Sequence, residues 1–367
     1  MHESRIYICP MAHAGDTTEF RRLLDEGEID VADIQGIMIT HEGDLVANAY
    51  ASLVYAEVLS ERLGWPATDL TEEFPIQALA GAVGFMTPHA AIMTRREVPG
   101  AAATGEKRLA IAGTCTRRFL PEEVGTAAYI NEIRDRVRDL YKELEVESPD
   151  DVGLVFCKTG WPGARHRADV ASRGAALRSD DWWTSSELAR GGAALGVGAA
   201  LGEFAEDDLE KRLNVDAGLY SQIAQCSSTE ERDSVAIIMF ANTRASVSPT
   251  VIGRCVMKDG LDQETPRALA ASLMGVADPS SDEFDLDRVE YGFLKPKTAE
   301  APDLRGRRHT LKEHPAVGHM WWMIEKAPVH AAVAACLDLP VMEVATGPEH
   351  QGPTGRPLLS LVVRVDD

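Results

Sequence analysis

The chain has 367 residues, of which 45% are hydrophobic, and its 58 acidic and 37 basic residues give a formal net charge of −21. A surface that binds nucleic acid needs clustered Lys and Arg, so this charge argues against a nucleic-acid partner. No apolar run reaches the roughly 18 residues that cross a bilayer, so the sequence also argues against a membrane protein.

The N-terminus and the cysteines favour a cytoplasmic protein. The first residues lead directly into a strand-like run, Ile6-Tyr7-Ile8-Cys9, without the apolar segment of a signal peptide. The six cysteines are scattered and show neither a C-x-x-C motif nor paired spacing, so we expect reduced thiols. The length suggests two or three domains.

Hydrophobic periodicity predicts alternating strands and helices in the first part of the chain. The expected order is strand, helix, strand, helix, small-residue loop and strand, at residues 6–9, 17–24, 35–40, 46–63, 79–82 and 90–94. Asp16 is the expected N-cap of the first helix, and Gly64 with Pro66 ends the second.

The same order is predicted twice more along the chain. The second unit has its elements at residues 108–112, 121–144, 153–158, 186–201, 224–229 and 234–242. The third has them at residues 250–257, 266–275, 289–295, 319–337, 344–347 and 358–365. The repeat predicts an α/β fold of three structurally similar units, at residues 1–104, 105–248 and 249–367, around one central cleft.

Equivalent positions in the three units carry different side chains. The second strands end in Thr40, Lys158 and Lys295, and the small-residue loops carry Leu79, Ser227 and Ala345. Only the second unit combines a lysine with a serine. A serine becomes a nucleophile when a neighbouring base takes its proton, so Ser227 and Lys158 are the candidate pair. Cys226, beside Ser227, remains an alternative nucleophile.

Five motifs in order resemble the cyanuric acid hydrolase and barbiturase family of ring-opening amidohydrolases, of which the chain looks like a diverged member. They are Lys158 at a strand end, Ala189–Gly196, Ser227-Ser228, Arg305–Thr310 and Glu349–Pro353. The resemblance covers nearly the whole chain. It implies a pseudo-threefold fold in which each unit gives one Lys, one Arg and one Ser to a central site, and one Ser–Lys pair does the chemistry.

The resemblance implies hydrolysis of a cyclic amide or imide C–N bond in a small-molecule heterocycle. Ser227 would be the nucleophile, Lys158 the base and Arg190 a substrate-binding residue, with burial beside Arg190 lowering the lysine pKa. Backbone N–H groups around Ser227 and Ser228 would hold the oxyanion. The other expected substrate-binding residues are Ser228, Thr40, His41, Leu79, Ala80, Lys295, Ala345 and Thr346.

The first and third units depart from the family pattern. Thr40, about Ser52 and Leu79 stand at the expected Lys, Arg and Ser positions of the first unit. In the third unit Lys295 fits the lysine position, with Lys297 as an alternative, the arginine is lost near Gly318-His319, and Ala345 replaces the serine. Cyanuric acid, a threefold-symmetric ring, is therefore not the expected substrate. The retained Gly81 and Gly347 suggest a backbone that still approaches a ligand closely.

The resemblance also implies a divalent ion in the third unit and a homodimer or homotetramer. Mg²⁺ or Ca²⁺ would suit oxygen ligands, and no organic cofactor is expected. The candidate ligands are Glu300, Pro348, Gln351, Gly352, Pro353 and Gly355. The tryptophan pairs Trp182-Trp183 and Trp321-Trp322 are expected to serve packing or subunit contacts rather than ring stacking.

Two other functions stay open at this point. One is a binding or regulatory relative without turnover, against which the intact Lys158, Arg190 and Ser227 set argues. The other is an enzyme that uses Lys158 alone for proton transfer on a ring ketone.

Overall fold

The computed structural model describes residues 1–102, 105–281, 283–311 and 321–365, and within them the strands form three four-stranded sheets. The first sheet contains β1 (His2–Pro10), β2 (Ile34–His41), β3 (Ile76–Ala80) and β4 (His89–Glu97). The second contains β5 (Arg108–Cys115), β6 (Val152–Gly160), β7 (Ala224–Thr229) and β8 (Ala236–Thr243). The third contains β9 (Thr250–Val256), β10 (Val289–Lys295), β11 (Glu343–Val344) and β12 (Leu358–Arg364).

The three sheets share one topology. In each sheet the spatial order is first, fourth, second and third strand, as in β1-β4-β2-β3. The second and third strands pair in parallel, and the other pairs are antiparallel. Each second strand also shifts register at the same place relative to its fourth strand, at 34/36, 152/154 and 289/291. Bulges are specific local features, so their repetition supports a threefold plan.

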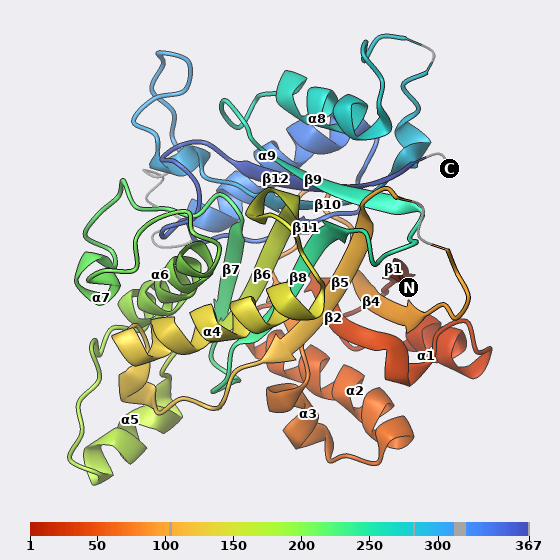
Figure 1. The fold of residues 1–367 in the computed structure, drawn as a ribbon. Coiled ribbons are helices and arrows are strands. Elements are labelled where there is room, and N and C mark those ends of the chain that lie inside the picture. Colours follow the sequence, from red (N-terminus) through yellow and green to blue (C-terminus); the bar gives the residue numbers. More distant parts are fainter. Residues whose placement is uncertain (103–104, 282, 312–320, 366–367) are drawn as a thin grey trace.

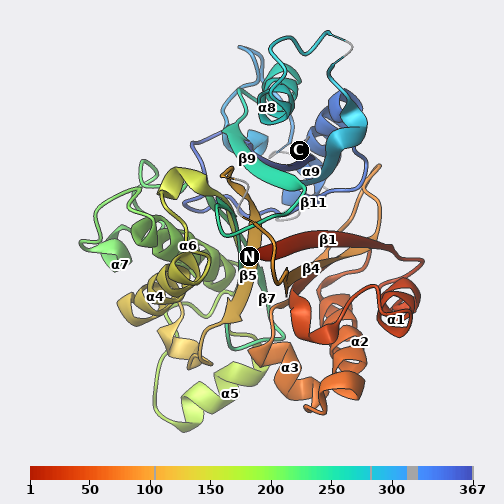
Figure 2. The same ribbon diagram turned by 45° about the vertical axis from the view of Figure 1, so that its right-hand side comes forward.

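Helices cover the outer face of each sheet (Figure 1). The first sheet carries α1 (Thr18–Asp25), α2 (Leu45–Leu63) and α3 (Ala67–Glu73). The second carries α4 (Ala127–Glu143), α5 (Ala164–Ser172), α6 (Trp182–Ala200) and α7 (Leu209–Arg212), and the third α8 (Glu264–Met274) and α9 (Trp321–Leu337). The Asp44 side chain caps the start of α2, and Gly64 ends it with φ +72°. Figure 2 shows the three resulting lobes around the middle of the molecule.

The hydrophobic core has an outer and an inner part. Each sheet packs its outer face against its own helices. The inner faces of all three sheets meet in a shared core, to which equivalent positions contribute Met38, Phe156 and Phe293. Along a strand the side chains alternate between the two faces. The residues two positions further on lie near the ends of β2, β6 and β10 and therefore project toward the same centre. They are Thr40, Lys158 and Lys295.

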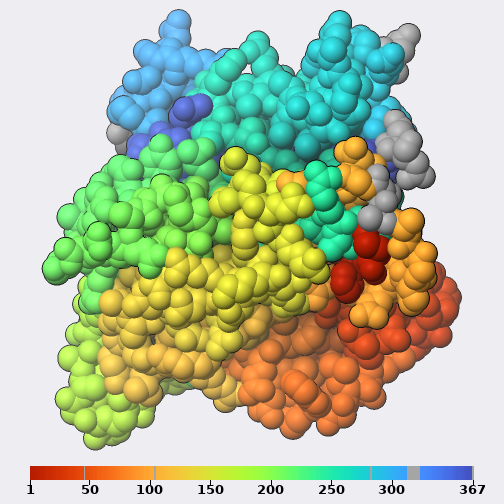
Figure 3. Space-filling model, viewed as in Figure 1, coloured from red at the N-terminus to blue at the C-terminus, as the bar shows by residue number. Residues whose placement is uncertain are grey.

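The threefold α/β fold predicted from the sequence is confirmed. The space-filling view shows each third of the chain as a continuous block (Figure 3). Strands of the three sheets occupy residues 2–97, 108–243 and 250–364, while the exact unit boundaries remain a prediction. In the part of the chain that the structure describes, no helix is both long and apolar enough to cross a membrane.

Two predicted loops prove to be strands. Leu79 and Ala80 end β3, and Ser227 with Ser228 lies within β7. Both are short strands at the edge of their sheets, and they are rich in Ala, Ser or Gln, which have low or moderate β-propensity. Pairing with the neighbouring parallel strand holds them extended. The predicted helix at 319–337 begins outside the described residues, as does the Gly318-His319 position.

Candidate active site

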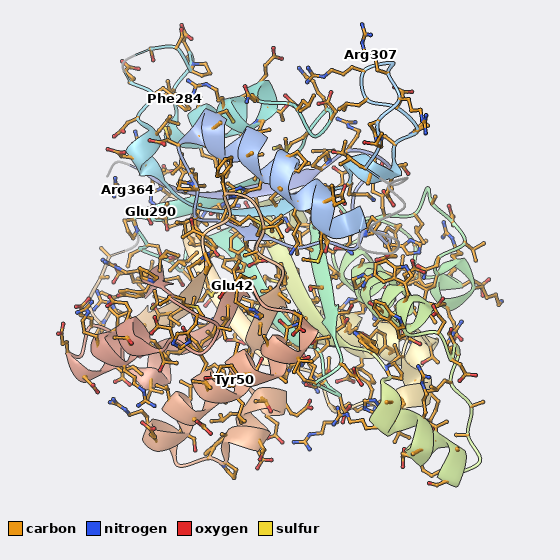
Figure 4. The ribbon with its side chains drawn as sticks, turned by 180° about the vertical axis from the view of Figure 1, so that it is seen from behind. Glu42, Tyr50, Phe284, Glu290, Arg307 and Arg364 are labelled. Carbon is orange, nitrogen blue, oxygen red and sulfur yellow. The ribbon has the colours of Figure 1, made fainter. Side chains whose placement is uncertain are left out.

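A pocket lies where the three units meet, between the ends of the second and third strands and the helices α2, α6 and α9. Eight predicted site residues line it, namely Ser227, Lys158, Arg190, Ser228, Leu79, Ala80, Ala345 and Thr346. Its walls also include Asn48, Trp161, Trp182, Trp183, Ser186, Lys326 and Gly347. Seen from behind, exposed Glu42, which follows β2, lies near the middle of the molecule (Figure 4). Each unit thus contributes a different wall.

Lys158 and Ser227 face each other across two parallel strands. The two residues are in register between β6 and β7, and Lys158 Nζ lies 3.3 Å from Ser227 Oγ. This distance is at the outer edge of hydrogen-bond reach, as is common before a substrate binds. The side chains lie on the inner faces of their strands, because the preceding residues Cys157 and Cys226 belong to the outer core.

Burial makes Lys158 a better base. The side chain is 2% exposed, and burial lowers its pKa from 10.5 to about 8. The cations Lys326 and Arg232 lower it further, whereas nearby carboxylates raise it. Arg190 was expected to be the neighbouring positive charge that lowers the Lys158 pKa, and this detail was wrong. Lys326 and Arg232 supply that charge. At pH 7 about one molecule in ten would carry a neutral Lys158, against roughly one in three thousand for an exposed lysine.

Arg190 is fixed by a buried ion pair before any substrate arrives. Its Nε and Nη2 donate to the two carboxylate oxygens of Glu349 at 2.7 and 2.9 Å. Burial opposes ionisation of Glu349, but the charge and hydrogen bonds of Arg190 lower the pKa of this carboxyl. The remaining Nη1 donates to Ser228 Oγ at 2.9 Å and to Ser186. Four guanidinium N–H groups are therefore committed to partners within the protein, two to Glu349 and two to the serines.

Gly347 is retained because Arg190 occupies the space beside it. Gly347 has φ +92°, and a Cβ atom there would lie 2.2 Å from Arg190 Nε. Gly81 has φ +83°, and its Cβ position would lie 2.7 Å from a methyl group of Met323. These glycines are required by contacts within the protein. Close approach to a ligand stays a prediction for these glycines, and Gly347 does line the pocket.

Strand geometry favours Ser227 over Cys226 as the candidate nucleophile. Cys226 is fully buried in the outer core, on the face of β7 opposite to Ser227. Its N–H donates to Gln351 Oε1 at 2.5 Å, at the outer edge of the strand. Because backbone amides alternate between the two edges, the N–H of Ser228 points toward the same edge. It is our candidate for an oxyanion donor.

Thr40 and His41 make hydrogen bonds within the protein and are not among the described residues that line the pocket. The Thr40 hydroxyl donates to buried Glu343, a residue that no motif had identified. His41 Nε2 lies 2.9 Å from Asn48 Oδ1, and its Nδ1 accepts from the Gly43 N–H at 3.1 Å. Burial lowers the pKa of His41, although the Asn48 contact raises it. Their role in substrate binding stays a prediction, and the structure shows both side chains hydrogen-bonded within the protein.

Lys295 supports the backbone of the site rather than its surface. Its Nζ donates to Cys226 O at 2.7 Å and to Thr346 O at 2.9 Å. Burial lowers its pKa to about 7. The ammonium group thus joins β7 to the loop that follows β11, and the described pocket walls do not include it. Lys295 also continues the register of β10, which distinguishes it from the alternative strand-end lysine, Lys297.

Lys326 on α9 is the main pocket residue that the sequence reasoning missed. Its Nζ donates to Ala80 O at 3.1 Å and to Gly81 O at 3.3 Å. Burial lowers its pKa to about 8, while Glu343 raises it. Lys326 lies beside Gly81 in the same way as Arg190 lies beside Gly347. The third unit therefore keeps a cation at the position equivalent to Arg190 of the second unit. The signal was present, because Lys326 follows Lys295 by 31 residues and Arg190 follows Lys158 by 32.

Aromatic side chains form one wall of the pocket. The ring of Trp182 lies 5.7 Å from that of Trp161 and 5.4 Å from that of Trp183, measured between centroids. The Arg190 guanidinium lies 5.4 Å from the Trp183 centroid. Trp182 and Trp183 were expected to serve packing or subunit contacts, but both line the pocket. Aromatic walls accept flat or apolar groups.

The candidate metal ligands are gathered in one place but surround a lysine. Lys297 Nζ donates to Pro348 O and Gly352 O and forms an ion pair with Glu300. The Gln351 amide bonds instead to Cys226 and Gly347, and Pro353 and Gly355 lie in the next turn. Within the described residues no group of three or more His, Cys, Asp or Glu side chains is placed to hold a metal ion.

Known proteins resemble this chain in sequence and in structure over nearly its whole length. The sequence profile of the family described as amidohydrolase ring-opening protein matches residues 5–364. A cyclic amide hydrolase from Rhodococcus sp. is 32% identical over 96% of this chain and 100% of its own length. Barbiturase 1 from Nocardioides sp. is 30% identical over 94% of each chain. A solved cyanuric acid hydrolase structure superposes with a TM-score of 0.88 at 28% identity, covering 99% of this chain and 100% of that one.

Proposed function

The chain belongs to the ring-opening amidohydrolase family, and from this premise we propose that it hydrolyses a C–N bond of a cyclic amide or imide with Ser227 as the nucleophile. The observation that carries the proposal is the 3.3 Å approach of Lys158 Nζ to Ser227 Oγ in the pocket shared by the three units. We further propose that the enzyme works in the cytoplasm as a homodimer or homotetramer, without an organic cofactor.

The reaction follows from the positions of three groups. Ser227 Oγ attacks a ring carbonyl carbon while Lys158 Nζ takes the hydroxyl proton. The tetrahedral oxyanion is held by the Ser228 N–H and stabilised by the positive charge of Arg190 at the pocket wall. The ring C–N bond then breaks, and the leaving nitrogen takes the proton from Lys158. Water, deprotonated by the same lysine, hydrolyses the acyl-serine ester and leaves the opened ring with a new carboxylate.

Positive charge around the site favours this chemistry. Lys158, Arg190 and Lys326 all line the pocket and come from two different units. A negative charge that develops on the carbonyl oxygen is stabilised by such preorganised donors more than in water, because the site is largely shielded from solvent. One oxyanion donor is typically worth about 3–4 kcal/mol. We propose that Lys326 binds a second carbonyl of the ring, opposite the Ser227 edge.

The apolar walls favour an asymmetric substrate. Leu79 and Ala345 occupy the positions equivalent to Ser227 in the other two units, and both are buried in the inner core beside the pocket. A ring carbonyl facing them would lose its hydrogen-bond partner, which lowers specificity strongly. An alkyl or aryl group would instead gain roughly 25 cal/mol per Å² buried. Together with the tryptophan wall, this favours a cyclic imide or lactam with a substituted edge.

A substrate panel tests this assignment. We expect kcat/KM for alkyl- or aryl-substituted cyclic imides to exceed that for cyanuric acid and barbituric acid by roughly tenfold or more, since one buried methylene or one unpaired polar group corresponds to about 1–3 kcal/mol. Ring opening is followed by mass spectrometry as the gain of one water. Leu79→Ser with Ala345→Ser should shift the ranking toward cyanuric acid. A wild-type preference for cyanuric acid, or a ranking unmoved by both serines, would contradict the proposed substrate.

The pH dependence tests the role of Lys158. A protonated lysine cannot accept the serine proton, so kcat/KM should fall about tenfold per pH unit below a pKa of about 8 and level off above it. Lys326→Met removes a neighbouring cation that lowers the Lys158 pKa, so this variant should move the acidic limb to higher pH. An acidic limb of the pH profile centred near the ordinary pKa of a histidine or a carboxyl group would argue for a different base. So would an acidic limb that Lys326→Met does not move.

A further inference from the structure

We propose that the ammonium group of Lys297 is a built-in cation that takes the place of a divalent metal ion in the third unit. Lys297 is 3% exposed. Its Nζ donates to Gly352 O at 2.9 Å and to Pro348 O at 3.0 Å, and it lies 3.0 Å from Glu300 Oε2. An ammonium group has three N–H donors and no acceptor. The two carbonyls therefore accept two of its N–H groups, and the Glu300 carboxylate neutralises its charge.

The oxygens around Lys297 are the kind that a hard cation prefers. One carboxylate and two backbone carbonyls are typical ligands of Ca²⁺ and Mg²⁺. Such an ion binds its oxygens at about 2.0–2.6 Å, so an ion between these three would overlap the position of Nζ. It would also meet the full repulsion of a buried ammonium charge. With Lys297 in place, the residues that were expected to hold a divalent ion do not fit one.

The ammonium group of Lys297 anchors a loop whose residues contact the active site. Residues 348–352 lie between the two carbonyls that Lys297 binds. Within this loop Glu349 accepts both hydrogen bonds that orient Arg190, and Gln351 accepts the N–H of Cys226, next to the nucleophile. Lys297 is thus a positioning residue that acts through the loop.

A surface hollow borders the residues that surround the buried cation. A second hollow on the surface is lined by Lys297, Glu300, Pro348, Glu349 and Gly352 among others. The short helix η5 (Thr298–Glu300) places the Glu300 carboxylate three residues after the lysine. Removal of the lysine side chain would leave these oxygens facing an accessible space. The proposal therefore predicts that the site lacking the lysine accepts a free divalent ion.

The wild-type protein gives the first test. We expect less than one tenth of an equivalent of divalent metal by elemental analysis of the purified full chain. EDTA, Mg²⁺ and Ca²⁺ should each leave the Tm unchanged within error. A stoichiometric divalent ion, or a Tm that falls on addition of EDTA, would overturn the proposal. Neither measurement depends on the reaction that the enzyme catalyses, so this inference and the proposed function can fail separately.

The second test makes the site dependent on metal. Lys297→Ala leaves a buried carboxylate and two carbonyls without their cation, so we expect a loss of roughly 5 °C or more in Tm and a fall in kcat. Millimolar Mg²⁺ or Ca²⁺ should restore both, because binding to the folded state alone raises stability. Recovery of kcat by the ion distinguishes a cation role from a purely steric one.

Two variants serve as controls for that rescue. Lys297→Ala combined with Glu300→Ala removes the carboxylate as well, and we expect no recovery by either ion. Lys258→Ala removes an exposed lysine that pairs with Glu264, and it should change neither the Tm nor the response to metal. If Lys297→Ala keeps the wild-type Tm, or if no divalent ion rescues it, Lys297 does not replace a metal ion.

Discussion

Replacing Ser227 by alanine is expected to lower kcat by roughly 10³- to 10⁶-fold while the fold is retained. Loss of a serine nucleophile in other hydrolases has effects of this size, because no other group can form the acyl-enzyme. The hydroxyl is small and lies at the pocket, so its removal should change the Tm by little. Rates are measured under single-turnover conditions with the best substrate of the panel, and the acyl-enzyme is sought by intact-protein mass spectrometry.

The adjacent cysteine offers a matched control. Cys226→Ala changes the neighbouring residue on the opposite face of β7 and should leave kcat within about threefold of wild type, although a buried core side chain is lost. An acyl adduct that persists in Ser227→Ala, or a rate close to that of wild type, would show that the attacking group lies elsewhere. A large loss in Cys226→Ala alone would point to the thiol.

Replacing Lys158 by methionine is expected to lower kcat by about 10²- to 10⁴-fold, the usual contribution of a general base. Methionine fills a similar volume without a charge, and Lys158 lies in a buried position on β6. The fold should therefore remain stable, since an apolar side chain avoids the desolvation that lowers the lysine pKa. kcat and the Tm are measured together to separate chemistry from folding.

Two other lysines identify the base by comparison. Lys142 on α4 is exposed, so Lys142→Met should be silent. Lys295→Met removes the link between Cys226 O and Thr346 O, and we expect a smaller loss of kcat together with a lower Tm. If Lys158→Met keeps more than a tenth of the wild-type kcat while Lys295→Met is inactive, Lys295 rather than Lys158 takes the serine proton.

The central strands could be predicted from the sequence because their environment leaves a simple pattern. β6 and β10 are largely buried on both faces and carry mostly apolar runs that lead to Lys158 and Lys295. The edge strands β3 and β7 gave no such pattern. Their Ala, Ser and Gln residues resemble a loop, and only pairing with the neighbouring strand makes them extended.

The approach of Lys158 to Ser227 could be predicted, whereas much of their surroundings could not. Lys158 and Ser227 stand at equivalent positions of a repeat, which sequence comparison between the units reveals. Lys326 and the tryptophan wall come from helices, and which helix face reaches the pocket depends on packing across units. The role of Lys297 depends on a loop some fifty residues later in the chain, with a spacing of 51 to its carbonyl partner in Pro348. No local pattern reports such a contact.

The inner core that the three sheets share determines when the enzyme can become active. Each sheet is complete within its own third of the chain, so its strands can pair as soon as that third leaves the ribosome. The inner apolar face of each sheet, however, finds its partners only on the other two sheets. A nascent chain with one or two units therefore exposes a surface that invites misassembly and chaperone binding. The pocket itself is complete only when residues 345–347 of the third unit reach the centre, so its walls form only after all three units have packed together.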